Sequence, residues 1–125
     1  MNVRHSSGSI VLALAIGAAL SGCAPATVPP TARGTVVVVT EDEYSIVLSE
    51  TQFRAGAYTF EVHNDGGATH NLRITGPGLG DAETPNIAPD GTGSLTVTLQ
   101  SGEYDLFCAT QDHKMAGMDA TIKVK

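Results

Sequence analysis

Three residues that can bind a metal ion lie within one eleven-residue segment near the C-terminus. Cys108, His113 and Met118 bring a thiol, an imidazole and a thioether together. Sulfur ligands combined with imidazole nitrogen are the set that selects copper. His70 is the candidate for a fourth ligand, because it stands at the start of a predicted strand directly after a glycine-rich turn. The sequence therefore predicts a copper site built from two separate segments.

Cys108 also allows a simpler interpretation. It could be a buried, unreactive core cysteine, or it could pair with Cys23, the other cysteine of the chain. An unpaired cysteine is uncommon in an oxidising compartment, and metal binding together with the histidine and methionine that follow would explain why Cys108 is unpaired. These neighbours favour the metal site.

Two further residues compete for a place in the site. Met115 is close enough to His113 to replace Met118 as the thioether ligand, but no glycine precedes it, and we expect an apolar residue on the rim. His63 falls on the polar face of its predicted strand, which favours a solvated surface histidine.

Strands, with no credible amphipathic helix, are predicted to position these residues. Segments rich in β-branched residues or alternating between apolar and polar residues predict strands at 35–40, 44–48, 57–64, 70–75, 94–99, 104–108 and 120–124. A charged turn is expected at 41–43, and a long glycine- and proline-rich surface connection at 76–93. Short strands separated by turns predict an all-β fold, a Greek-key β-sandwich or barrel.

Alternation within three of these strands also predicts which side chains form the core. One face of each strand is apolar, and the residues expected to point inward are Tyr58, Phe60, Val62, Leu95, Val97, Leu99, Tyr104, Leu106 and Cys108.

The N-terminal residues have the pattern of an export signal. Arg4 precedes an uncharged, largely apolar run at 10–20, which is too short to span a bilayer because a spanning helix needs about 20 apolar residues. The sequence LSGC that ends at Cys23 resembles the lipobox of bacterial lipoprotein signals, in which a lipid is attached to the cysteine. An ordinary cleaved secretory signal is the alternative, and both place the rest of the chain outside the cytoplasm.

This organisation predicts three segments. Residues 1–22 would be the signal peptide, 23–34 a flexible tether rich in proline and small residues, and 35–125 a single domain. A lipidated Cys23 would anchor the domain to the bacterial cell membrane, or to the periplasmic or outer envelope, without a spanning helix.

Charge narrows the range of partners. From Cys23 onward the chain has six basic and thirteen acidic residues, a net charge of −7. An acidic surface argues against nucleic acid and against attraction to anionic lipid headgroups, and it permits a basic protein partner. We expect a monomer.

Two segments carry a resemblance to a known family. FRAGAYTFEVHNDGGATHNLRI, from Phe53, and GEYDLFCATQDHKMAGM, ending at Met118, resemble the two signatures of the cupredoxin family, and the resemblance covers nearly all of the chain from Phe53 to Val124. It implies a type 1 (blue) copper site of the kind found in plastocyanin and pseudoazurin. The implied trigonal ligands are His70, Cys108 and His113, and the implied weak axial ligand is Met118.

The resemblance also implies a role for Asn71. Its backbone N–H is expected to donate to the thiolate, and its side chain is expected to hold the cysteine loop. The chain departs from the family pattern between the cysteine and the second histidine, where many members have a proline and this chain has Thr110-Gln111-Asp112. The reduction potential therefore stays open.

These features predict a one-electron carrier that cycles between Cu(II) and Cu(I) and exchanges electrons with a redox protein through the edge of His113. A copper-handling protein that buffers or delivers the ion is the alternative, although the chain lacks a run of methionines or histidines. We do not expect an enzyme. In the multicopper enzymes of this superfamily histidines flank the cysteine, and here Phe107 and Ala109 stand in those places.

Overall fold

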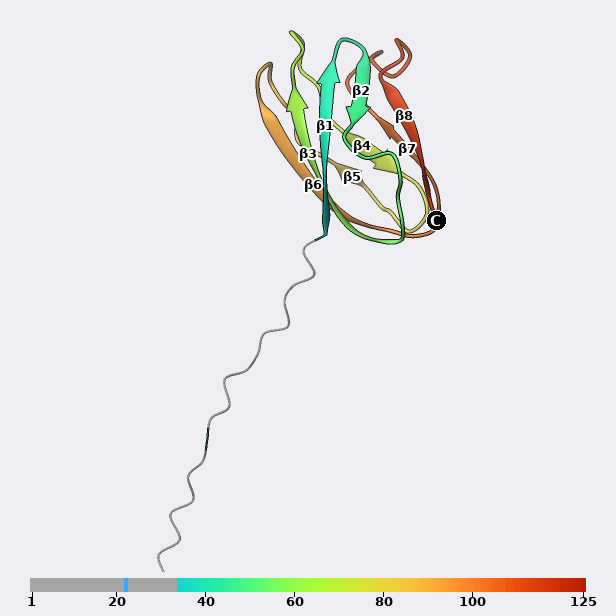
Figure 1. The fold of residues 1–125 in the computed structure, drawn as a ribbon. Helices are drawn as coiled ribbons and strands as arrows, with labels where there is room; N and C mark the ends of the chain where they lie inside the picture. The colour runs from blue at the N-terminus through green and yellow to red at the C-terminus, as the bar shows by residue number, and fades with distance from the viewer. Residues whose placement is uncertain (1–21, 23–33) are drawn as a thin grey trace, which may run out of the picture.

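Two four-stranded β-sheets face each other in the structure (Figure 1). The computed structural model describes Gly22 and residues 34–125. One sheet has the strand order β2-β1-β3-β6 and the other β5-β4-β7-β8. The strands are β1 (Thr35–Asp42), β2 (Ser45–Leu48), β3 (Gly56–Asn64), β4 (Arg73–Thr75), β5 (Ala82–Glu83), β6 (Thr92–Leu99), β7 (Gly102–Phe107) and β8 (Asp119–Val124). The predicted all-β sandwich is confirmed.

The first sheet is organised around β1 and β3. The valine-rich β1 pairs in parallel with β3 and antiparallel with β2, and β3 pairs antiparallel with β6. β-branched side chains suit such a half-buried pleated surface. In the second sheet all three strand pairs are antiparallel, with β7 between β4 and β8.

The core between the sheets follows the alternation of the strands. The inward-facing residues of β3 and β7 are buried in the hydrophobic core. Leu95, the first inward-facing residue of β6, is half-buried and packs against the same core. The buried members among the predicted core residues are Tyr58, Phe60, Val62, Val97, Leu99, Tyr104, Leu106 and Cys108. The predicted core is therefore confirmed.

The predicted turn at 41–43 is wrong. Strand β1 continues through Asp42, Glu41 pairs with Ile46 of β2, and the turn lies at Glu43 and Tyr44. The side chain of Glu41 has no exposed surface, because it continues the inward face of Val37 and its neighbours on β1. The pairing register decides the face of a strand residue, even where that residue carries a carboxylate.

The predicted strand at 70–75 and the predicted loop at 76–93 also need correction. Regular pairing starts only at Arg73, and the connection that follows contains the short strand β5. His70 instead forms an isolated bridge with Ile87, in which the His70 N–H donates to the Ile87 carbonyl at 3.1 Å and the Ile87 N–H donates to the His70 carbonyl at 2.7 Å. The long connection thus fixes the backbone of His70.

Three connections gather at one end of the sandwich. The β1–β2 turn, the β3–β4 connection and the β7–β8 connection lie at the end opposite the start of β1 and the C-terminus (Figure 1). No helix among residues 34–125 is long and apolar enough to cross a bilayer. The predicted signal, the lipidation at Cys23 and the tether lie outside the described residues.

Candidate metal centre

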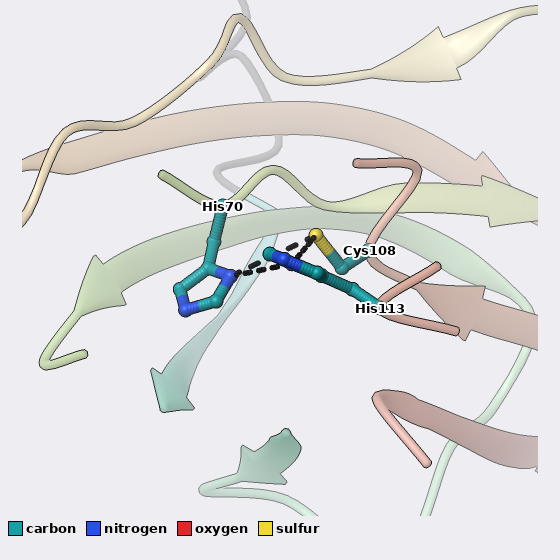
Figure 2. A group of neighbouring side chains, drawn as sticks. All are labelled: His70, Cys108 and His113. Carbon is teal, nitrogen blue, oxygen red and sulfur yellow. Dashed lines mark hydrogen bonds between the residues drawn. The ribbon is translucent and has the colours of Figure 1, made fainter. Parts of the chain in front are cut away.

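The three predicted nitrogen and sulfur ligands meet at the end of the sandwich that contains the β1–β2 turn and the β3–β4 and β7–β8 connections. The Sγ of Cys108 lies 3.5 Å from Nδ1 of His113 and 3.9 Å from Nδ1 of His70, and the two Nδ1 atoms lie 3.1 Å apart. Figure 2 shows the three side chains converging, with His70 on one segment of the chain and Cys108 and His113 on another. Among the described residues these three form one cluster whose ligand atoms all lie within 4.8 Å of one another.

The spacing of these atoms fits a metal ion. A point equidistant from all three lies roughly 2 Å from each, close to the length of bonds from nitrogen and sulfur to a divalent ion. The donor chemistry is one thiol and two imidazole nitrogens, and a trigonal set of this composition is characteristic of blue-copper sites. The residues present therefore fit a copper ion.

The backbone around each of the three side chains holds it in place, and the three come from two segments of the chain. His70, with no exposed surface, is fixed by its backbone bridge to Ile87. Cys108 is a free, fully buried thiol directly after β7, and its N–H donates to the Met118 carbonyl at 3.2 Å. His113 is half-buried in the β7–β8 connection. Two segments brought together by the sandwich are needed to complete the cluster.

The two methionines of the loop have opposite environments. Met118 has no exposed surface, and its N–H donates to the His113 carbonyl at 3.1 Å. Met115 is 86% exposed. Gly117, directly before Met118, has a φ of 106°, which lies in the region that side chains rarely adopt. Burial therefore favours Met118 over Met115 as the thioether ligand, and this role stays a prediction.

Asn71 ties the cysteine loop to the β3–β4 connection. Its Oδ1 accepts the Ala109 N–H at 2.7 Å and faces the Cys108 thiol at 3.7 Å. Its Nδ2 donates to Glu83 Oε1 at 2.6 Å and to Asn86 Oδ1 at 3.2 Å. The Asn71 side chain thus contacts the cysteine loop. Donation from the Asn71 backbone to a thiolate stays a prediction.

Glu43, which no sequence pattern indicated as a site residue, contacts a candidate ligand. Its Oε1 lies 3.2 Å from Nε2 of His70 and accepts the Ala68 N–H at 2.7 Å. The backbone N–H groups of Ala68 and Gly67, followed by His70, lower the pKa of Glu43 to about 2. Glu43 is therefore a carboxylate at neutral pH. No sequence signal marked it, because a glutamate in a charged turn is usually solvated.

A second acidic residue, Glu41, lies in the core between the sheets. It is fully buried, and neither carboxyl oxygen has a hydrogen-bond partner within the described part of the chain. Burial raises the pKa of Glu41 to about 7, because the charged form is poorly solvated there.

The surface next to the cluster combines aromatic and charged side chains. The ring of Tyr44 meets the ring of His113 edge to face, with centroids 5.2 Å apart. Lys114 forms an ion pair with Asp105 and lies over the ring of Phe107. His63 is half-buried on β3 and does not belong to the cluster.

Comparison with known proteins gives structural matches only. No protein-family model and no curated protein sequence matches the chain. Auracyanin from the photosynthetic bacterium Roseiflexus castenholzii is 20% identical, with a TM-score of 0.59, over 74% of this chain and 98% of that chain. Auracyanin A, a "blue" copper protein from Chloroflexus aurantiacus, is 18% identical, with a TM-score of 0.60, over 74% and 99% of the two chains.

An enzyme shares the same architecture. A multi-copper oxidase from Pediococcus acidilactici is 18% identical, with a TM-score of 0.53, over 75% of this chain but only 27% of that chain. At these identities the matches establish the fold, which is the cupredoxin-like sandwich.

Proposed function

We propose that this chain is an extracytoplasmic one-electron carrier that holds a single type 1 copper ion. The observation that carries the proposal is the convergence of Cys108 Sγ with Nδ1 of His70 and His113 at 3.1 to 3.9 Å. Met118 would be the fourth, weak ligand. When bound, copper supplies the one-electron couple between Cu(II) and Cu(I). Reduction takes one electron from a donor protein, and oxidation passes it to an acceptor.

Burial of the ligands favours a carrier over a copper-handling protein. The side chains of His70, Cys108 and Met118 have no exposed surface, and only His113 among the four is partly exposed. A protein that delivers its ion to a partner needs ligands that the partner can displace. Rigid, enclosed ligands can instead keep similar positions in both oxidation states of the copper ion. The partly exposed His113 offers the electron a short path to the protein surface.

The charge distribution supports a basic redox partner. Residues 34–125 carry thirteen acidic and five basic side chains. At the rim of the site, Lys114 is paired with Asp105, while Asp112 beside His113 is exposed. Complementary charge accelerates encounter and orients the partner before electron transfer.

Copper addition to the purified metal-free domain tests the proposal. We expect one equivalent of Cu(II) to produce an intense visible band from thiolate-to-copper charge transfer, and one equivalent of Zn(II) to produce none. Titration with Cu(II) that yields only weak bands, with the Cys108 thiol still reactive, would refute the proposed site.

Met118 and Met115 should respond differently to the same substitutions. An axial donor stabilises Cu(II) more than Cu(I), and a hard amide oxygen does so more strongly than a thioether. Met118→Gln should therefore lower the reduction potential, and Met118→Leu, which leaves no axial donor, should raise it. Potentiometric titration should show opposite shifts at 118, and little change for Met115→Gln and Met115→Leu. A large shift at 115 with none at 118 would reverse the assignment of the axial ligand.

The proposal places the domain on a lipid anchor at Cys23. Eleven residues separate Cys23 from β1, and a chain of that length reaches at most about 40 Å. β1 begins at the end opposite the β1–β2 turn and the β3–β4 and β7–β8 connections (Figure 1), so the tether would join the domain at the end away from the cluster.

Substitution of Cys23 tests the anchor. In cells, Cys23→Ala should move the protein from the membrane fraction to the soluble extracytoplasmic fraction with its copper band unchanged, because the tether and the site are separate parts of the chain. If the variant still sediments with membranes after a high-salt wash, lipidation of Cys23 is not the anchor.

A further inference from the structure

Glu43 occupies an unusual position for a turn residue. Its carboxylate reaches from the β1–β2 turn to the β3–β4 connection, where one oxygen contacts both Nε2 of His70 and the N–H of Ala68. The side chain of Glu43 is 35% exposed, while that of His70 has no exposed surface. The contact therefore joins a partly exposed anion to the buried face of a candidate ligand.

The neighbouring chain is shaped to admit this contact. A Cβ at Gly66 would lie 2.5 Å from Glu43 Oε1 and 2.9 Å from His70 Nε2, closer than real Cβ atoms approach other atoms. Gly66 is itself held in place, since its N–H donates to Asn64 Oδ1 at 2.9 Å. A side chain at 66 would therefore force the carboxylate or the imidazole to move.

We propose that Glu43 is a positioning residue that sets the tautomer and orientation of His70. A neutral imidazole carries one proton, and the hydrogen bond made by one ring nitrogen decides which nitrogen keeps it. With the proton on Nε2 and donated to Glu43, the lone pair of Nδ1 points toward Cys108 and His113. This inference rests on the proposed function only in taking copper as the partner of Nδ1.

The charge of Glu43 has a second consequence. The carboxylate lies one imidazole ring away from the three converging ligand atoms, and the ring that separates them is buried. A nearby negative charge stabilises the more positive ion, so Glu43 should favour Cu(II) over Cu(I). Neutralising it should raise the affinity for Cu(I) relative to Cu(II), and each tenfold change in that ratio corresponds to about 59 mV in a one-electron couple.

The alternative role for Glu43 is a purely local one, in which it accepts the Ala68 N–H and stabilises the turn. Two substitutions separate the roles. Glu43→Gln keeps an oxygen acceptor and removes the charge, whereas Glu43→Ala removes both. Asp65→Asn is the matched control, because it removes one exposed carboxylate from the β3–β4 connection, which carries His70, and no hydrogen bond or ion pair joins the described Asp65 and His70 side chains.

Nitrogen-15 NMR of the histidine rings in the metal-free protein at pH 8 provides the main test. We expect His70 of the wild type to carry its proton on Nε2 alone, and His70 of Glu43→Ala to show both tautomers. Glu43→Gln should keep the wild-type tautomer, which also shows that the turn folds without the charge. If His70 in Glu43→Ala keeps a single Nε2-protonated ring, Glu43 does not set the tautomer.

Metal binding supplies the second readout. Loss of the partner behind a histidine ligand typically lowers metal affinity about 10- to 100-fold, and we expect Cu(I) affinity to fall by that factor in Glu43→Ala. Glu43→Gln should raise the reduction potential, and Asp65→Asn should change it less. Equal shifts in these two variants would mean a general charge effect and would overturn the specific role. Should copper not bind at His70 at all, the NMR comparison would still decide the role of Glu43.

Discussion

Cys108→Ser should abolish the visible charge-transfer band and weaken Cu(I) binding more than any other single substitution at the cluster. The band needs a thiolate, whose soft, loosely held electron pairs a serine hydroxyl lacks. We expect the loss of Cu(I) affinity to exceed the roughly 10- to 100-fold cost of removing a hydrogen-bond partner behind a ligand. Absorption spectroscopy and competition with a Cu(I) chelator measure both effects.

The Cys108→Ser substitution should leave the fold unchanged. Serine is close to cysteine in size, and the neighbouring contact, in which the Ala109 N–H donates to Asn71 Oδ1, does not involve the sulfur. Circular dichroism of the variant should therefore match that of the wild type. If Cys108 were only a core cysteine, both proteins would bind copper equally and neither would be blue.

Glu41 should make the folded domain less stable as the pH rises. In the unfolded chain a glutamate loses its proton near pH 4.5, while in the folded protein Glu41 keeps it until about pH 7. Between these values the folded state binds more protons, so its stability falls with increasing pH and levels off above about pH 7. A shift of this size corresponds to about 3 kcal/mol between pH 4 and pH 8.

Chemical denaturation of the metal-free domain at several pH values measures this effect. The difference in unfolding free energy between the wild type and Glu41→Gln isolates Glu41, because the glutamine does not titrate. The lowered pKa of Glu43 has the opposite sign, since its stabilisation is lost as the pH falls from about 4.5 toward 2, and it is common to both proteins. Glu61→Gln, at an exposed position of β3, is the control. Parallel curves for the wild type and Glu41→Gln would contradict the prediction.

Much of the fold and of the cluster could be predicted from local sequence. Alternation in β3, β6 and β7 identifies the buried face, because successive side chains of a strand point to opposite sides. The spacing of Cys108, His113 and Met118 places three donors in one connection, and such a loop can bring its own side chains together. His70 could be proposed from its position after a glycine-rich turn.

Other features depend on the path that the chain takes in the folded protein. Burial of Met118 and exposure of Met115 follow from hydrogen bonds within the β7–β8 connection and from the link between Cys108 and Met118. In the sequence, the glycine before Met118 favours Met118 over Met115 as the ligand, but the path of the loop decides which methionine is buried.

Glu41 and Glu43 show most clearly what the sequence alone could not predict. From the sequence, Glu41 and Glu43 belong to a charged turn, since isolated carboxylates favour water. Parallel pairing of β1 with β3 carries Glu41 into the core and brings the turn at Glu43 beside Ala68 and His70. The residue types and their spacing determined the donor set, and the packing of strands distant in sequence decided which charges surround it, because burial depends on what covers a side chain.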